Sequence, residues 1–438
     1  MNDAINKETT PVQRAYGAAL TTYIASLAFF SPSESHFLYY FLSLVMFIFV
    51  GLAIAKNKIE GVLHALYRKH RKWFVILILW LVASTLSLIM VWSNDSTENL
   101  QRGLSLIRHV YDISLLGLVF VLARLQALRI IDVKALFFAL ALGFSVMLGL
   151  EIIIYHQVAI DAKTWFESPP LGLHVRDQGN LACVIAVSMA AYWAVKPPTK
   201  IAQKIVLSTA LCIGLSFVYW SGGRMAITAT LITLLILSGF IFYTRQPHKY
   251  QWLLLIILSI AVSVLIAECL SVYPWNGIGR TLHDAQTVST AAVDNANNAQ
   301  MLNQVTTGRA TMWKISLKAF SESPWLGLGP YGYFFIPEEL FGDQPHNFII
   351  QFLVEWGILG AVCLLLLLAA CFVFILQRMT KAFQQQDACW VMAASVICVL
   401  TLHGLTGGTY FMAQPLSFLA IAFSVPLAKL LRAPSFSV

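Results

Sequence analysis

The chain of 438 residues is long enough for two or three soluble domains, but 58% of its residues are hydrophobic and only 11% are charged, which excludes that class. Its mean hydropathy of +0.72 is typical of a polytopic membrane protein. We interpret the net charge of +8 as a signal of membrane orientation, so no nucleic-acid partner is expected. The seven cysteines lie in or at the ends of apolar segments without metal-ligand spacing, and we predict that they pack as small core side chains.

Apolar segments recur along the chain at the length that crosses a bilayer. We therefore predict an all-α polytopic membrane protein with about twelve transmembrane helices, each of about 20 residues. They form a single membrane-embedded domain over residues 1–438, and an even number of crossings places both termini on one side. A long helical outer loop, residues 272–346, separates the ninth helix from the tenth. The predicted helices cover residues 15–31, 37–55, 73–92, 110–126, 133–155, 180–195, 204–220, 225–243, 252–271, 347–377, 389–405 and 411–431.

The lysines and arginines are distributed unevenly between the predicted loops. With a cytoplasmic N-terminus, most of the 29 basic residues fall in cytoplasmic loops, as the positive-inside rule requires. The cluster Arg68-Lys69-His70-Arg71-Lys72 is interpreted as an anchor beside anionic lipid. The first apolar segment lacks a small-residue cleavage site, so we expect it to be retained.

The outer loop changes character along its length. Its first half is rich in small and polar residues, whereas Trp313, Leu317 and Phe320 recur at helical spacing and Pro324 then ends the pattern. We expect an amphipathic helix here, lying over the outer membrane surface.

Two arginines on the predicted outer side stand at expected helix starts. Arg224 follows two glycines and Arg309 follows one. Backbone N–H groups at a helix start, together with a guanidinium, form an anion site, so both positions indicate a phosphorylated ligand. Arg176 is a weaker third candidate, because Asp177 beside it can neutralise its charge. For Arg224 the alternative is an arginine that reaches to the membrane interface.

A histidine precedes the long apolar helix that follows the outer loop. His346 comes directly after Pro345, and the positive end of the helix disfavours imidazolium, so the neutral ring can act as a general base. A helix-capping or interfacial histidine is the alternative. In the same helix we expect Gly357 and Gly360 on one face, where a neighbouring helix or a lipid approaches closely. Glu355 is either a functional carboxylate or a buried structural partner.

Metal-ligating patterns are missing from the sequence. There is no Asp-x-Asp and no His/Cys metal spacing, so we expect neither a metal nor another cofactor. A metal-dependent transferase holds a cation on the diphosphate of its donor. Here we expect arginines to take the place of that cation. A transporter, the alternative from a different class, would place charges along a path at mid-membrane depth. The candidate arginines and histidine instead gather at the outer surface.

The chain from about Gly179 to its end resembles the O-antigen ligase and polymerase superfamily. The family pattern is a histidine, a small polar residue, a nine-residue gap and Gly-x-x-Gly. His346-Asn347 and Gly357 to Gly360 match it. The stretch before it is also similar, through Thr307-Gly308-Arg309, Trp313, Pro324 and Gly327-x-Gly329. The turn Ser221-Gly222-Gly223-Arg224 resembles the family's Ser-x-Ser-Arg-Gly turn with the second serine and the final glycine changed.

The resemblance implies a GT-C-like membrane glycosyltransferase of the bacterial inner membrane. It would transfer a glycan from undecaprenyl diphosphate to a sugar hydroxyl of lipid A-core on the periplasmic side, without a metal and with inversion. His346 would be the general base, and Arg224, Arg309 and Arg176 would bind the diphosphate. Asn347, Gly357 and Gly360 would support the site, with the polyprenyl tail lying beside the two glycines.

The implied partners are the lipid-linked glycan donor, the lipid A-core acceptor and membrane lipids, and the chain is expected to act as a monomer. The number of helices and the single principal outer loop favour the ligase. A polymerase of the same superfamily, a protein O-glycosyltransferase and a flippase for lipid-linked oligosaccharide remain as alternatives.

Overall fold

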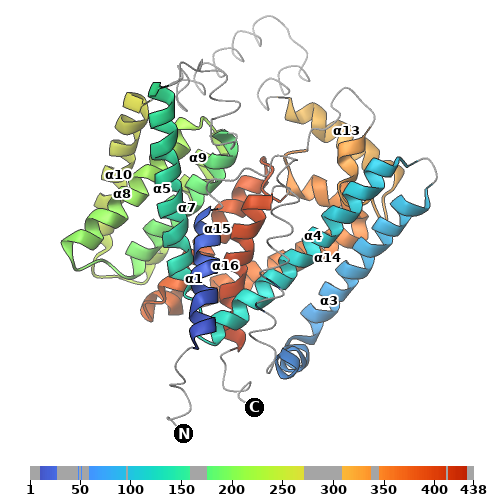
Figure 1. Ribbon diagram of the computed structural model, residues 1–438, viewed down its shortest axis with the longest axis horizontal. Helices are drawn as coiled ribbons and strands as arrows, with labels where there is room; N and C mark the ends of the chain where they lie inside the picture. The colour runs from blue at the N-terminus through green and yellow to red at the C-terminus, as the bar shows by residue number, and fades with distance from the viewer. Residues whose placement is uncertain are drawn as a thin grey trace, which may run out of the picture.

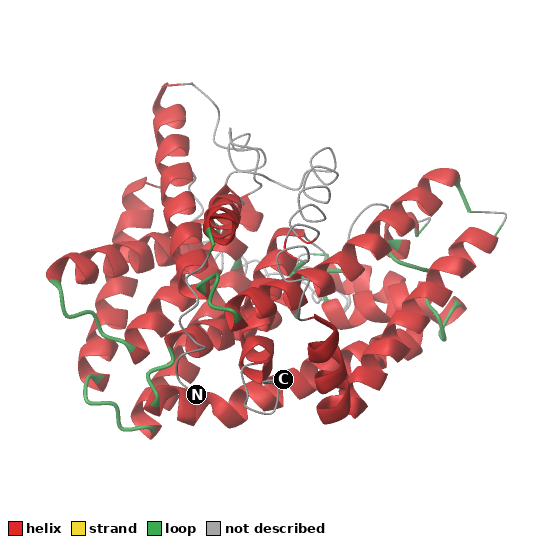
Figure 2. Ribbon diagram, turned by 60° about the horizontal axis from the view of Figure 1, so that its bottom comes forward, coloured by secondary structure: helices red, strands yellow, loops and turns green. Residues whose placement is uncertain are grey.

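The computed structural model describes residues 10–26, 48, 51, 59–94, 97–157, 175–270, 308–336, 345–410 and 413–431. These residues form twelve α-helices and one short 3-10 helix, with no strand among them (Figure 2). The elements are α1 (Pro11–Ser26), α3 (Ile59–Ser93), α4 (Asn99–Ala127), α5 (Val133–Gln157), α7 (Val175–Val195), α8 (Ile201–Trp220), α9 (Arg224–Tyr243), α10 (Lys249–Leu270), α13 (Arg309–Glu322), η2 (Gly332–Phe335), α14 (Phe348–Gln384), α15 (Ala388–Gly404) and α16 (Ala413–Leu431).

Nine of the described helices are long and apolar enough to cross a membrane. The chain is therefore an all-α polytopic membrane protein, as predicted. The helix expected over 37–55 lies outside the described residues apart from 48 and 51; each of the other predicted helices has a counterpart. The amphipathic helix predicted in the outer loop is α13.

The outer helices of the bundle turn apolar side chains away from the protein. In α10, Leu254, Ile257 and Leu265 are 57%, 55% and 65% exposed, whereas Trp252 is fully buried. Exposed aliphatic side chains at helical spacing are stable in contact with lipid tails and unfavourable in water. This side of α10 is therefore a lipid-facing surface.

Helix α15 lies at the centre of the bundle (Figure 1) and packs against α7, α9, α14 and α16. Small residues bring the surrounding helices into close contact: a Cβ added to Gly214 in α8 would lie 2.9 Å from the backbone nitrogen of Ala186 in α7. This packing fixes the ends of the central helices relative to one another.

Helix α1 begins and α16 ends on the same face of the bundle, at the bottom of Figure 1. A Cβ on Gly17 of α1 would lie 3.3 Å from the carbonyl oxygen of Ile130, in the turn after α4. Leu431, at the end of α16, clusters with Ala123 near the end of α4, and Lys429 forms an ion pair with Asp387, directly before α15. Because α15 begins on this face, it ends on the opposite one, where α13 lies (Figure 1).

Candidate active site

Helix α14 is interrupted at Gly357, which has φ +61° and ψ −169°. In a continuous helix, the carbonyls of Val354 and Glu355 would accept from the N–H groups of Ile358 and Leu359. The break removes these two bonds. Four backbone groups inside an apolar helix therefore need other partners.

The segment that connects α13 to η2 supplies those partners. Four backbone hydrogen bonds join it to α14: Leu328 N to Val354 O (2.7 Å), Gly329 N to Glu355 O (3.1 Å), Ile358 N to Pro324 O (2.8 Å) and Leu359 N to Trp325 O (3.3 Å). The segment is thus inserted into the hydrogen-bond ladder of α14. We call residues 324–329 the inserted loop.

Glycine is required where the two backbones meet. A Cβ on Gly357 would lie 2.3 Å from the carbonyl carbon of Trp325, and one on Gly327 would lie 2.5 Å from the carbonyl oxygen of Val354. Both residues also have positive φ, at +61° and +71°, which favours glycine. The sequence predicts that a neighbouring helix or a lipid comes close to Gly357. In the structure the backbone of the inserted loop occupies that space, and the helix predicted over 347–377 is broken there. The same contact leaves no room for a polyprenyl tail against Gly357. Gly360 lies near Ala83 of α3 and near Trp356 of its own helix.

The side chain of Glu355, whose backbone carbonyl bonds to the inserted loop, is fully buried. Gln351 donates to its carboxylate (3.2 Å), and Arg108 of α4 lies within electrostatic range. Arg108 in turn donates to Asp112 (3.2 Å) and to the carbonyl oxygen of Tyr410 (3.0 Å). Of the two predicted roles for Glu355, this arrangement fits the buried structural partner, since buried charges require partners of opposite sign.

Arg108 and Asp112 were not predicted from the sequence. Their signal is present, because an arginine and an aspartate four residues apart in an apolar helix face each other and neutralise each other. In the structure they connect α4 to the turn between α15 and α16. Burial raises the pKa of Tyr410, in that turn, to about 12, so its phenol stays protonated and shares a hydrogen bond with Thr401 (3.1 Å).

His346 lies directly before the first turn of α14, is partly exposed and has φ +49°. The indole of Trp313 in α13 donates to the carbonyl oxygen of the preceding Pro345 (2.7 Å). Asn347, and not His346, caps the helix: its Oδ1 accepts from Ile349 N (2.9 Å) and Ile350 N (3.1 Å). The alternative of a helix-capping histidine is therefore wrong.

Arg309 is the first residue of α13, and Gly308 at its N-cap has φ +84°. Arg224 is the first residue of α9, with Gly223 at the N-cap. Neither helix has a side-chain hydrogen bond at its cap. The prediction that both arginines follow glycine at a helix start is confirmed.

The structure brings Arg309 and His346 to one region. Arg309 lies within electrostatic range of His403 at the end of α15. Two residues further on, the carbonyl oxygen of Leu405 accepts from the side-chain amide of Asn347 (3.0 Å). The start of α13, the end of α15 and the start of α14 therefore meet around the candidate base.

Arg224 lies at the same end of the bundle, because α9 is antiparallel to α15. Thr233 of α9 donates to the sulfur of Cys398 (3.6 Å), and Gln246 after α9 donates to Phe383 O at the far end of α14 (3.4 Å). The turn before Arg224 packs on α7, where a Cβ on Gly179 would lie 3.1 Å from the hydroxyl of Ser221. Arg176 is in the first turn of α7, and its side chain lies outside the described part of the chain.

Residues 208–365 match the sequence model of the O-antigen ligase family. This part of the chain is therefore similar to O-antigen ligases. No curated protein matches it. The matched region is narrower than the resemblance predicted from Gly179 onward.

The O-antigen ligase region contains most of the candidate site. It includes Arg224, Arg309, His346 and Gly357, whereas the buried Arg108 and the turn with Tyr410 lie outside it. The hydrogen bond from Arg108 to Tyr410 O connects α4 to the turn after α15, so it supports the matched region from outside. The site can supply a proton acceptor beside cationic helix starts, which is the chemistry that displacement of an anionic leaving group needs.

We expect Asn347→Ala to lower both the stability and the activity of the protein. The variant loses two cap bonds and the bond to Leu405, and loss of an N-cap costs about 0.5–2 kcal/mol. Asn347→Asp is the matched control: its carboxylate can still accept from the helix start, but it cannot donate to Leu405. Thermal unfolding in detergent should rank wild type above the aspartate variant and the aspartate variant above the alanine variant. Equal melting temperatures for all three would show that the cap does not stabilise the site.

Proposed function

We propose that the chain is an O-antigen ligase. It transfers a glycan from undecaprenyl diphosphate to a sugar hydroxyl of lipid A-core, on the periplasmic side of the bacterial inner membrane, with both termini in the cytoplasm. The observation that carries the proposal is the convergence of His346 with two arginine-bearing, glycine-capped helix starts at one end of the bundle, all within the region that matches the O-antigen ligase family.

His346 acts as the general base. The acceptor oxygen attacks the anomeric carbon of the donor sugar, and the bond from that carbon to the diphosphate oxygen breaks, with its electron pair leaving on the diphosphate. The hydroxyl proton passes to the imidazole of His346. Attack on the side opposite the leaving group inverts the anomeric carbon. The hydrogen bond from Trp313 to Pro345 O and the Asn347 cap support this role, because they hold the backbone on both sides of the base.

Arg224 and Arg309 bind the diphosphate and stabilise the charge that develops as it leaves. Each stands beside backbone N–H groups of a first helical turn that has no side-chain cap, and such N–H groups favour an anion. Arg176, in the first turn of α7 next to the Arg224 turn, is a third contributor. The guanidinium groups take the place that a divalent cation has in metal-dependent transferases, so the reaction is metal-independent.

The test uses the purified full chain in detergent with undecaprenyl-diphosphate glycan, with and without lipid A-core, in a chelator. Products are resolved by size. We expect glycan on lipid A-core only when that acceptor is present. Lengthening of the lipid-linked glycan without the acceptor would make the protein a polymerase with the same site, and the absence of any product would contradict the proposed function.

We expect Arg224→Lys and Arg309→Lys each to lower the rate of transfer by about 10- to 1000-fold. Lysine keeps the charge but cannot pair with a phosphate through two parallel N–H groups. Arg245→Lys, just after the opposite end of α9, is the matched control and should keep the wild-type rate. Initial rates at saturating acceptor give the comparison. Wild-type rates in both site variants would remove the arginines from the diphosphate site.

A further inference from the structure

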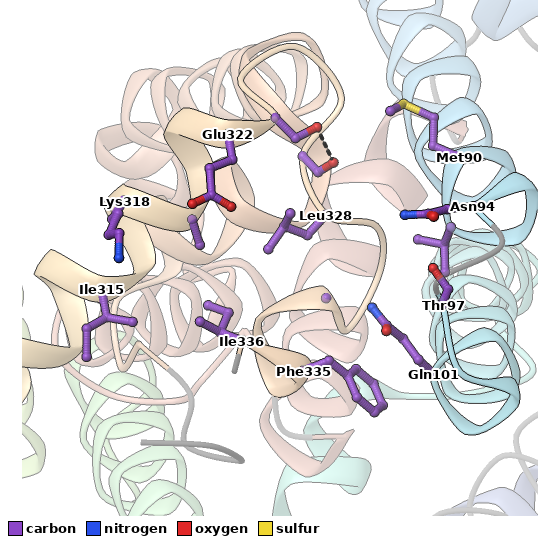
Figure 3. A pocket seen from close by; sticks show the side chains of 15 residues that line it. Met90, Asn94, Thr97, Gln101, Ile315, Lys318, Glu322, Leu328, Phe335 and Ile336 are labelled. Atoms are coloured by element: carbon purple, nitrogen blue, oxygen red, sulfur yellow. Dashed lines mark hydrogen bonds between the residues drawn. The ribbon is translucent and has the colours of Figure 1, made fainter. Parts of the chain in front are cut away.

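A cavity of about 580 Å³ lies between α13 and the neighbouring ends of α3 and α4 (Figure 3). We call it the outer cavity. This volume is within the range of about 300–1,000 Å³ that is typical of small-molecule sites. It takes no part in the reaction proposed above.

One wall of the outer cavity is a single face of α13. Ile315, Lys318, Ala319 and Glu322 line it, and their spacing of three or four residues places them on the same side of the helix. Figure 3 shows Lys318 and Glu322 on the cavity side of this helix. The wall therefore offers one positive and one negative side chain beside aliphatic surface.

The opposite wall carries neutral polar groups. Asn94 and Thr97 lie between α3 and α4, and Gln101 is in the first turns of α4. Figure 3 shows the amide of Gln101 pointing into the space between the walls, near the ring of Phe335. Amides and a hydroxyl here provide both donors and acceptors.

These groups together select the class of ligand. A phosphate is disfavoured because the charges of Lys318 and Glu322 cancel. A lipid tail is disfavoured because it would cover the amide and carboxylate groups of the walls without offering them hydrogen bonds. A neutral sugar fits, because its hydroxyls can bond to amide, hydroxyl and charged side chains, while its C–H face can lie on an aromatic ring such as Phe335.

The outer cavity lies further along α13 than the candidate site at the start of that helix. Arg309 begins α13, and the lining residues Ile315 to Glu322 follow about 9–20 Å further along the axis at about 1.5 Å per residue. The inserted loop also contributes Gly327 and Leu328 to the lining, and Ser323 donates to the carbonyl oxygen of Gly327 (2.8 Å; dashed line in Figure 3). A sugar in the outer cavity is therefore held on the same rigid support as the candidate site but away from the reacting carbon.

We propose that the outer cavity is a glycan subsite, which binds neutral sugar residues of one substrate beyond the sugar that reacts. The subsite rests on the proposed function, since both substrates of that reaction carry a glycan. Donor glycan and acceptor core share this chemistry, and the test separates them.

The test compares wild type with the double variant Gln101→Ala/Lys318→Ala. The matched control is Asn99→Ala/Lys314→Ala, which removes the same two kinds of side chain from α4 and α13 at exposed positions that do not line the cavity. KM is measured for donor and acceptor separately. We expect KM for one substrate to rise about 10- to 30-fold in the double variant, with kcat and the other KM changed less than about twofold, and the control to behave as wild type. The substrate affected identifies which glycan occupies the cavity.

A binding measurement keeps this test independent of catalysis. The probe is the oligosaccharide released by mild acid from lipopolysaccharide, free of lipid and diphosphate, observed by saturation-transfer NMR with the full chain in detergent. We expect binding to wild type and to the control, and loss of binding in the double variant. Unchanged KM values and unchanged binding in the double variant would overturn the subsite. If no variant transfers glycan, the proposed function fails, and the binding arm alone decides: selective loss supports the subsite, while no binding to wild type, or equal binding to all variants, contradicts it.

Discussion

His346→Ala should abolish glycan transfer while the protein still inserts, folds and binds the donor. A general base contributes about 10²- to 10⁴-fold to the rate, which is about 3–5 kcal/mol of transition-state stabilisation at 1.36 kcal/mol per factor of ten. The fold should survive because His346 is only partly buried and because Asn347 caps the helix. The measurement is the initial rate of lipid A-core glycosylation at saturating donor and acceptor.

Two further readouts separate a base from a structural residue. The melting temperature of the alanine variant should remain within a few degrees of wild type, and added imidazole should restore part of the lost rate, because it can occupy the space and accept the proton. Normal turnover in the alanine variant would remove His346 from the mechanism. A large loss of melting temperature without rescue would assign it a structural role instead.

Gly357→Ala should have the largest effect on the fold. Its Cβ would lie 2.3 Å from the backbone of Trp325, and an alanine at φ +61° is strained whatever the space. Backbone strain of about 1–3 kcal/mol and overpacking of about 1–3 kcal/mol together predict about 2–6 kcal/mol of destabilisation. Displacement of the inserted loop should also remove the transfer activity, because the loop follows directly on α13, the helix that begins with Arg309.

Gly239→Ala, inside α9 and four residues before its end, is the matched control for this variant. A Cβ at Gly239 meets nothing within 4 Å, and alanine favours the helix by about 0.5–1 kcal/mol relative to glycine. Thermal unfolding in detergent should therefore show a clear loss for Gly357→Ala and little change or a gain for Gly239→Ala. Equal melting temperatures for the two variants would mean that the loop is not seated in α14 as described.

Local signals were sufficient to predict most helices. A bilayer-length apolar run predicts a helix whatever its neighbours are, and glycine followed by arginine predicted the starts of α9 and α13. For α13 the predicted apolar positions differ from the buried ones: Leu317 is 44% exposed, whereas the small residues Ser316 and Ala319 are buried. Burial here depends on close approach, which the hydrophobic pattern alone does not reveal.

The break in α14 could not be predicted from the same signals. The run around Gly357 is as apolar as a continuous helix, and the partners that replace the missing helical bonds come from a segment about 30 residues earlier in the chain. Glycines at 327 and 357 indicate only that some backbone comes close. Which backbone it is depends on the fold as a whole.

The interruption of α14 separates the helix into two segments with different roles. The part after the break, Ile358–Gln384, is about 40 Å long at about 1.5 Å per residue and exceeds the hydrocarbon thickness of about 30 Å by itself. The part before it, Phe348–Trp356, is about 14 Å long and is not needed to span the bilayer. Membrane anchoring and the positioning of the candidate base thus fall to different stretches of one helix. The longer stretch can tilt to match the thickness of the surrounding membrane. The inserted loop meanwhile keeps the position of His346 relative to α13 unchanged.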